Sequence, residues 1–299
     1  MSTFAAWLKG HPQVRQLMLP VIWLRRHLII RRAQAKQAAL RSKLFGRIID
    51  GYVTFDLPEF SGRFDIGIRS DISSRIIFEG GYESVLAGLC VATLDSTRDA
   101  IDVGANVGLY TVLLAKHISS SKRILSLEPA PTAFRLLVRN VSQNAVMDRV
   151  ICKQVAASPK DAQLSLYAPR GREEYSSISD TLPTSQGDSF ECYRVIGLSL
   201  DRLCEEHGIK PGFIKIDVEG YEYQALLGAS GILSKFRPTV LIEIAPSLLA
   251  AHGDSAAKIL TLLSNLGYCV VDAESTSTTI GKTFGGYALA LPRTIKPVT

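Results

Sequence analysis

The chain has 299 residues, of which 46% are hydrophobic and 21% are charged. This is the composition of a globular protein, and it excludes a largely disordered or collagen-like chain. The length allows one large core or two domains. The five cysteines are scattered without a C-x-x-C pair, which argues against a zinc site or a disulfide framework and favours a reducing compartment.

Positive charge is concentrated in an N-terminal segment, residues 1–48, which we call the basic arm. The first 50 residues contain ten Lys and Arg and one acidic residue, whereas the remainder contains 24 basic and 27 acidic residues. The net charge of +6 therefore comes from the arm and does not indicate nucleic-acid binding by the rest of the chain. We expect a helix over residues 21–44, where strong helix formers are frequent.

The arm holds an apolar run, Leu17–Leu24, that ends at Arg25 and Arg26. This run is much shorter than the ~20 residues that span a bilayer, and no small-residue cleavage site of a signal peptide follows it. We therefore expect a cytoplasmic protein. Two interpretations of the arm stay open. Its apolar side packs on the domain, or residues 17–47 make a peripheral contact with the inner face of the membrane, with Trp23 and the leucines inserted.

After the arm we expect a cap region over residues 49–98 and a main domain over residues 99–299. The cap region holds two short strand-like pieces and a helix, Tyr82–Leu94. In the main domain, apolar strands alternate with amphipathic helices. We expect strands at residues 100–104, 123–128, 150–156, 213–217, 239–244, 268–273 and 286–291, and helices at residues 109–117, 132–144, 200–207, 222–233 and 255–266.

This alternation predicts an α/β fold. Strands that are apolar throughout indicate a parallel sheet covered by helices on both faces, so we expect a Rossmann-like, mostly parallel sheet of seven strands. Residues 162–200 interrupt the alternation, and their two strand-like pieces around a polar loop predict an inserted hairpin. That loop carries Tyr175, Ser176 and Ser177, and it either covers a second substrate or is disordered.

The turn after the first strand of the main domain is rich in glycine and is the candidate cofactor site. In an open parallel sheet, ligands bind beyond the carboxyl ends of the strands, near the point where the strand order reverses. Glycine lets the backbone approach a ligand closely, and the free N–H groups of the following helix point to the same place. Asn106 stands where a nicotinamide fingerprint needs its second glycine, which favours a cofactor with an amino-acid part. The residues assigned to this turn are Asp102, Gly104, Ala105, Asn106 and Gly108.

A second anchor, Glu128, ends the next strand 26 residues after Asp102. An acid at this place accepts hydrogen bonds from two ribose hydroxyls. We assign Pro129 and, at the end of the third strand, Ala156 to the same cofactor site. The alternative, a tight turn without a ligand, is disfavoured by the correctly placed acid.

Replacing Gly104 by valine should fill the cofactor's space and leave the fold intact.

Several segments resemble the FkbM family of S-adenosylmethionine-dependent methyltransferases. They are FEGGYE (78–83), IDVGANVGLYT (101–111), LEPAPTAFRLLVRN (127–140), SLDRL (199–203), FIKIDVEGYEYQALLGA (213–229) and LIEI (241–244). The resemblance implies a class I methyltransferase fold for residues 99–299, with S-adenosylmethionine as cofactor. It implies methyl transfer to a hydroxyl oxygen of a sugar, a glycolipid or a secondary metabolite. It also implies that Asp102, Gly104, Asn106 and Glu128 bind the cofactor.

Acidic residues at two later strand ends are the candidate catalytic groups. Asp217 ends the fourth strand, Glu219 follows in the loop, and Glu243 lies near the end of the fifth strand. An alcohol must be deprotonated or polarised before it attacks a sulfonium methyl group. We therefore expect Asp217 or Glu219 to act as a general base, or Asp217 and Glu243 to ligate Mg²⁺. In a third interpretation Glu219 or Glu222 only stabilises a helix N-terminus, and Lys215 only pairs with Asp217.

Two other functions compete with this interpretation. The basic arm suggests a nucleic-acid methyltransferase, but the acidic segment 217–220 would repel phosphates, and it lacks the (N/D)-P-P-(Y/F) turn of enzymes that modify base amines. A catalytically inactive binding module would be expected to lose its acidic anchors, yet Asp102, Glu128 and Asp217 are present. We expect a small-molecule, glycan or lipid-linked acceptor, and no nucleic-acid partner.

The membrane interpretation of the basic arm predicts salt-dependent binding to anionic lipid. Basic residues near an anionic surface contribute ~1 kcal/mol each. Full-length protein should therefore sediment with anionic vesicles at low salt and be released at high salt, whereas a variant that begins at Asp50 should stay in the supernatant. If the two proteins sediment equally, the arm packs on the domain instead.

Overall fold

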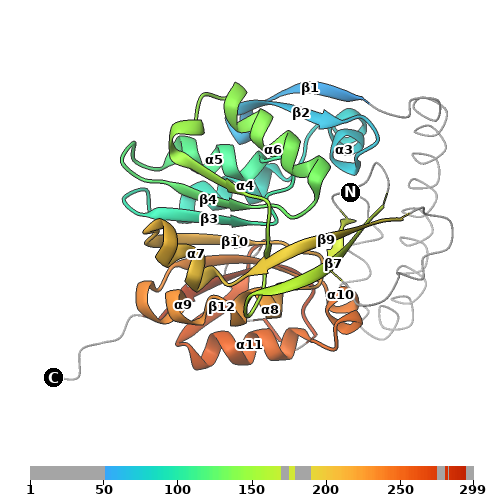
Figure 1. Cartoon of the computed structure of the whole chain (residues 1–299). Helices are drawn as coiled ribbons and strands as arrows, with labels where there is room; N and C mark the ends of the chain where they lie inside the picture. Colours follow the sequence, from blue (N-terminus) through green and yellow to red (C-terminus); the bar gives the residue numbers. More distant parts are fainter. Residues whose placement is uncertain (1–50, 170–174, 179–189, 275–279, 282, 294–299) are drawn as a thin grey trace, which may run out of the picture. The chain divides into compact units, whose positions relative to one another are not determined.

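The computed structural model describes residues 51–169, 175–178, 190–274, 280–281 and 283–293 (Figure 1). The basic arm, its expected helix and its expected membrane contact lie outside the described residues. The chain divides into two units, residues 1–51 and residues 52–299. The helices and strands labelled in Figure 1 all belong to the second unit.

The second unit is built on a seven-stranded sheet with the order β12-β13-β11-β10-β3-β4-β5. The pairs β11–β10, β10–β3, β3–β4 and β4–β5 are parallel, and β13 runs antiparallel to both of its neighbours. The predicted mostly parallel sheet of seven strands is therefore confirmed. Its strands are β3 (Asp99–Val103), β4 (Ile124–Leu127), β5 (Val150–Lys153), β10 (Pro211–Ile216), β11 (Thr239–Ile244), β12 (Tyr268–Asp272) and β13 (Gly286–Pro292).

Helices cover both faces of this sheet, as predicted (Figure 1). Successive side chains of a strand point to opposite faces. In β10, Phe213 accordingly joins the core beneath α4, α5 and α6, and Ile214 joins the core beneath α7, α8, α9 and α11. The helices are α3 (Asp71–Glu79), α4 (Ser84–Thr93), α5 (Leu109–His117), α6 (Pro131–Gln143), α7 (Leu200–His207), α8 (Glu222–Leu227), α9 (Ser230–Phe236), α10 (Pro246–Ala251) and α11 (Ala256–Asn265).

Helix boundaries follow local signals where such signals exist. Helix α7 begins and ends as predicted because Ser199 accepts a hydrogen bond from the Arg202 N–H and Gly208 adopts a left-handed conformation after the last turn. The single helix predicted over 222–233 is wrong, since α8 and α9 are separate. Gly228 lies at the break, where a Cβ atom would stand 2.1 Å from the Ser158 carbonyl oxygen.

The cap region contributes a two-stranded sheet and two helices. Strand β1 (Tyr52–Leu57), the 3-10 turn η1 (Pro58–Phe60) and β2 (Gly62–Gly67) form an antiparallel hairpin. The side chain of Asn140 in α6 bonds the backbone N–H and carbonyl of Asp65 in this hairpin, at 2.8 and 3.0 Å. The helix predicted for this region is α4, whereas α3 was not predicted.

The insertion predicted between residues 162 and 200 forms a sheet of its own. Its strands are β6 (Ala156–Ala157), β7 (Ala162–Pro169), β8 (Ser177–Ile178) and β9 (Phe190–Leu198), in the order β6-β9-β7-β8. The third main strand predicted over residues 150–156 is therefore too long: β5 ends at Lys153, and Ala156 pairs with Gly197 of β9 instead. Strands β7 and β9 pair antiparallel over residues 162–169 and 190–197, so the predicted hairpin is confirmed. In Figure 1 this pair crosses the carboxyl ends of the main strands.

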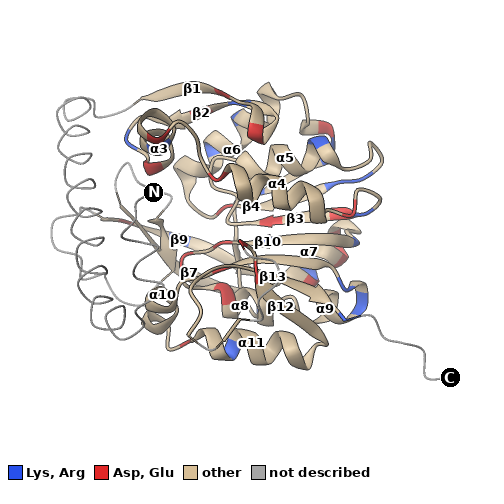
Figure 2. Cartoon of the chain, turned by 180° about the vertical axis from the view of Figure 1, so that it is seen from behind, with Lys and Arg blue, Asp and Glu red and all other residues tan. Residues whose placement is uncertain are grey.

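Charge is mixed over the described part of the chain. Figure 2 shows Lys and Arg (blue) interspersed with Asp and Glu (red) along the helices and turns. Within the described ranges, no single helix has the length and apolar composition of a membrane span. Helices α3 and α4 meet that criterion only when taken together, and they are bent by 107°.

Candidate functional site

Three turns meet at the point where the order of the sheet changes direction. The chain passes from β3 outward through β4 and β5 and then returns to β10 on the other side of β3. The turns after β3, β4 and β10 line a cavity of about 260 Å³, at the place where ligands bind in open α/β sheets. The predicted site residues that line it are Gly104, Ala105, Asn106, Glu128, Pro129, Ala156, Asp217, Glu219 and Glu243.

The predicted ribose anchor, Glu128, is held firmly in the wall of this cavity. Its Oε2 accepts a hydrogen bond from the Asn106 N–H and its Oε1 accepts one from the Ala130 N–H, both at 2.8 Å. Burial raises the pKa of Glu128 to about 7, although these two N–H donors oppose the shift. The carboxyl group is therefore fixed in direction before any ligand arrives.

Gly104 is required by the sheet itself. It has a φ of +76°, and a Cβ atom on it would stand 1.8 Å from the backbone oxygen of Asp217. The expectation that valine at this position leaves the fold intact is therefore wrong, because the added atoms would force β3 and β10 apart. Glycine here lets the two strand ends approach each other and so brings Asp217 beside the cofactor turn.

Two predicted cofactor residues lie behind the cavity wall. Asp102 is fully buried, and its Oδ2 accepts a hydrogen bond from the Thr111 hydroxyl at 2.6 Å. Its Oδ1 has no hydrogen-bond partner among the described residues, and burial raises its pKa. A Cβ atom on Gly108 would stand 2.8 Å from Leu137 Cδ1, so this glycine allows α5 and α6 to pack. Contact of these two residues with a cofactor stays a prediction.

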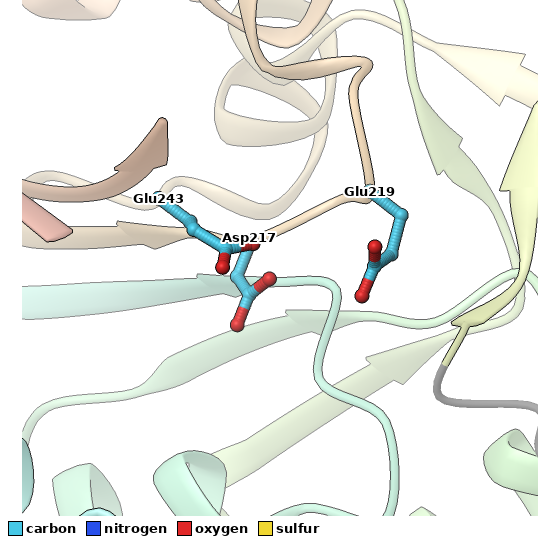
Figure 3. Close-up of side chains that lie close together, drawn as sticks. All are labelled: Asp217, Glu219 and Glu243. Carbon is cyan, nitrogen blue, oxygen red and sulfur yellow. The ribbon is translucent and has the colours of Figure 1, made fainter. Parts of the chain in front are cut away.

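The three predicted catalytic acids converge on one side of the cavity (Figure 3). Asp217, Glu219 and Glu243 each offer a carboxylate oxygen, and these oxygens all lie within 4.8 Å of one another. Parallel pairing of β10 with β11 brings Asp217 and Glu243 together, and a left-handed residue, Glu219 with φ +50°, turns the third carboxylate toward them. Hard oxygens at this spacing suit either a divalent cation or the sharing of a proton.

The charge of Asp217 is stabilised by neighbours on three strands. Lys215 Nζ donates to its Oδ2 at 3.0 Å, and the Tyr287 hydroxyl donates to the same oxygen at 2.9 Å. Burial alone would raise the pKa of Asp217, but the ammonium of Lys215 and the hydrogen bonds hold it below its ordinary value. Asp217 is therefore ionised, and the Lys–Asp pair expected from the sequence is confirmed.

Glu243 has the opposite protonation state. Burial, together with the charges of Asp217 and Glu219, raises the pKa of Glu243 to about 9. At neutral pH it therefore carries a proton, which it donates to Asp217. Glu222 takes a separate role, since its Oε1 accepts hydrogen bonds from the N–H groups of Val218 and Gly220 and so fixes the loop.

Several polar groups of the cavity were not predicted from the sequence. Tyr287 and Tyr110 line it, as do Glu83 and Arg75 from the cap region. Glu83 lies in the segment FEGGYE, and the glycine pair before an acid at a helix start was the available signal. The backbone offers a second signal, because Glu83 and two other cavity residues, Asn106 and Glu219, have positive φ. Such strained residues often occur at functional sites.

The insertion contributes part of the cavity wall. Tyr175, Ser176 and Ile178 line it, and the Ser177 hydroxyl donates to the Glu219 backbone oxygen at 3.1 Å. The described part of the predicted cover therefore lies beside the acidic loop.

The strand order and the cofactor turn define a class I S-adenosylmethionine-dependent methyltransferase fold. A match to the methyltransferase FkbM domain extends over residues 102–270, more than half of the chain. The chain therefore belongs to the FkbM methyltransferase domain family, and the resemblance found in the sequence is confirmed.

Individual relatives are distant. Methyltransferase sdnD of Sordaria araneosa is 27% identical in an alignment 182 residues long that covers 52% of this chain and 70% of that protein. The crystal structure of methyltransferase FkbM from Methylobacillus flagellatus KT is 17% identical with a TM-score of 0.42, and covers 74% of this chain. This chain spans 55% of the length of that protein. An O-methyltransferase from Bacillus cereus in complex with SAH is 15% identical with a TM-score of 0.39, over 74% of this chain and 96% of the other.

The raised pKa of Glu243 predicts a pH-dependent stability. The folded protein keeps a proton on Glu243 between its ordinary pKa of 4.5 and about 9, whereas the unfolded chain has lost it, so the free energy of unfolding falls as the pH rises through this window. Glu243→Gln removes the titration. Between about pH 5.5 and about pH 8.5, the thermal midpoint of wild type should fall by more than that of the variant.

Thermal unfolding followed by circular dichroism measures this difference. The matched control is Glu205→Gln on α7, which replaces an exposed acid and should follow the pH dependence of wild type. Parallel curves for wild type and Glu243→Gln would contradict a protonated Glu243.

Proposed function

We propose that the protein transfers the methyl group of S-adenosylmethionine to a hydroxyl oxygen of a small molecule, a glycan or a lipid-linked acceptor. The observation that carries this proposal is that an ionised carboxylate, Asp217, lies in the same cavity as the cofactor turn. Gly104 approaches the backbone oxygen of Asp217, and the Asp217 carboxylate lies in the same cavity as the cofactor residues.

Methyl transfer to an alcohol requires two things of the enzyme: it must position the two reactants, and it must supply a proton acceptor. A sulfonium methyl group is already reactive, so the site must hold two reactants in line. An alcohol becomes a nucleophile when its proton is accepted as it attacks. Asp217 accepts the hydrogen bond of the acceptor hydroxyl, Glu243 and Tyr287 orient this carboxylate through their own hydrogen bonds, and Glu219 is the second acceptor in reach of the same space.

The same carboxylates fit Mg²⁺, which prefers oxygen ligands. Asp217 and Glu243 would hold it, with Glu219 beside them, and the ion would polarise the acceptor hydroxyl. Glu243 must lose its proton for this, since a protonated carboxyl is a poor ligand for a cation. Lys215 and Tyr287 already donate hydrogen bonds to Asp217 Oδ2, so a metal ion could not bind this oxygen without displacing them. We therefore favour the version in which Asp217 is a base.

The acidic lining also supports the class of acceptor. Among the described residues, six acidic side chains line the cavity (Asp71, Glu83, Glu128, Asp217, Glu219 and Glu243), against two cations, Arg75 and Lys215, so the acids outnumber the cations even with Glu243 protonated. Negative charge attracts a sulfonium and repels the phosphates of a nucleic acid. An uncharged hydroxyl is therefore the proposed acceptor group, in the cytoplasm. A membrane contact through residues 17–47 would place the enzyme beside lipid-linked acceptors.

Labelled S-adenosylmethionine tests the acceptor class. Incubation with a cell extract, followed by separation into glycan, lipid, small-molecule, protein and RNA fractions, should place the label in the glycan, lipid or small-molecule fraction. Mild base should leave this label in place, because an ether is stable where a methyl ester hydrolyses. Label in RNA alone would overturn the proposed acceptor.

The base and the metal versions give different results with the same acceptor. A general base contributes about 10²–10⁴-fold to the rate, so Asp217→Asn should lower kcat by about that factor. Tyr287→Phe, which only removes one hydrogen bond to Asp217, should lower kcat less. Excess chelator should have no effect in the base version, whereas loss of activity that added Mg²⁺ restores would establish the metal version.

A further inference from the structure

One pair of opposite charges in the cavity has no part in the proposed proton transfer. Arg75 in α3 and Glu83 before α4 both line the cavity, and Arg75 Nη1 lies 3.7 Å from Glu83 Oε1. Both come from the cap region, ahead of the matched domain at residues 102–270. The Arg75 guanidinium also lies over the ring of Tyr82, at 4.6 Å from its centre, which fixes its direction.

Glu83 stands at the start of α4 but does not cap the helix with its side chain. Glu83 occupies the N-cap of α4, yet its side chain makes no capping hydrogen bond, and its φ of +44° is left-handed. A non-glycine residue in that region is strained. Its Oε2 accepts a hydrogen bond from the Tyr110 hydroxyl at 2.8 Å instead, and its side chain is 14% exposed. The strain thus directs a nearly buried carboxylate into the cavity.

Arg75 is the cation that a ligand carboxylate can reach. The other cation that lines the described cavity, Lys215, is 3% exposed and its Nζ bonds Asp217. The side chain of Arg75 is 36% exposed, and a guanidinium binds a carboxylate through two parallel hydrogen bonds. On the acidic side, Asp102 does not line the cavity, whereas Asp71 and Glu83 both line it near Arg75. We assign the ligand ammonium to Glu83, because its Oε1 lies 3.7 Å from Arg75 Nη1 and its side chain is only 14% exposed.

We propose that Arg75 and Glu83 form the subsite for the amino-acid end of S-adenosylmethionine, with Arg75 bonding its carboxylate and Glu83 its ammonium. A zwitterion presents both charges a few bonds apart, so it can insert between two side chains that already attract each other. The proposal rests on this cofactor alone and is independent of the acceptor. It also gives the cap region a function, namely to close the cofactor site of a domain that begins near residue 99.

Binding of three nucleosides to the full-length protein tests this subsite. S-adenosylhomocysteine carries both charged groups, 5′-(3-aminopropyl)thioadenosine keeps only the amine, and 5′-methylthioadenosine has neither. Titration calorimetry should show that Glu83→Gln weakens the first two by about tenfold or more, because a charged hydrogen bond is lost. The affinity for 5′-methylthioadenosine should change less than about twofold. Arg75→Met should weaken S-adenosylhomocysteine alone.

Two controls separate a subsite from a general loss of structure. Glu79→Gln replaces an exposed acid next to Arg75 that does not line the cavity, 3.6 Å away and 50% exposed, and should leave all three affinities unchanged. Glu128→Ala should weaken all three ligands, because each carries the ribose. Equal weakening of S-adenosylhomocysteine and 5′-methylthioadenosine by Glu83→Gln, or unchanged binding of S-adenosylhomocysteine to both subsite variants, would overturn the proposal. Arg75→Met keeps the test decisive if Glu83→Gln does not fold.

The failure of this proposal differs from the failure of the proposed function. If the label from S-adenosylmethionine enters RNA, the acceptor is wrong, and the three affinities still decide the subsite. If the variants bind all ligands as wild type does, the subsite is wrong, and methyl transfer to a hydroxyl is unaffected.

Discussion

The buried ammonium group of Lys215 compensates the negative charge of the carboxylates in and behind the cavity wall, and the rest of the site depends on this interaction. Burial alone would lower the pKa of Lys215, but the nearby carboxylates of Asp217, Asp102 and Glu83 raise it. Its Nζ also lies 4.7 Å from the centre of the Tyr110 ring, a favourable place for a cation. A carboxylate this deep in a protein is costly without a partner. One cation thus makes an acidic cavity floor compatible with a folded core.

The arrangement of protons follows from this charge balance. Lys215 stabilises Asp217 as an anion, and the anion in turn favours the protonated form of Glu243. Neighbouring carboxylates cannot easily all be ionised, so one of them keeps a proton. The pair therefore combines a proton acceptor with a donor that orients it. That combination is what an alcohol needs when its nucleophilic oxygen must face a sulfonium methyl group.

The backbone provides the second constraint. The ends of β3 and β10 approach so closely that only glycine fits at position 104. The left-handed residues Glu83, Asn106 and Glu219 then turn side chains or N–H groups toward the space beyond the strands. These conformations cost free energy, and they persist because the packed sheet and the helices on both faces fix the residues around them.

Local patterns in the sequence were enough to predict the α/β class, the seven main strands apart from the end of β5, the helices α5 and α7, and the identity of the acids at the strand ends. These features depend on hydrophobic periodicity, helix caps and turn residues, which are local and can be read from neighbouring residues. The groups that join these acids from other parts of the chain depend instead on tertiary contacts. Antiparallel pairing of β13 with β11 sets Tyr287 opposite Glu243, and packing of the cap region brings Glu83 to Tyr110. The protonation of Glu243 likewise depends on burial and on charges from several elements, because electrostatic energy is a property of distance in space rather than of spacing along the chain.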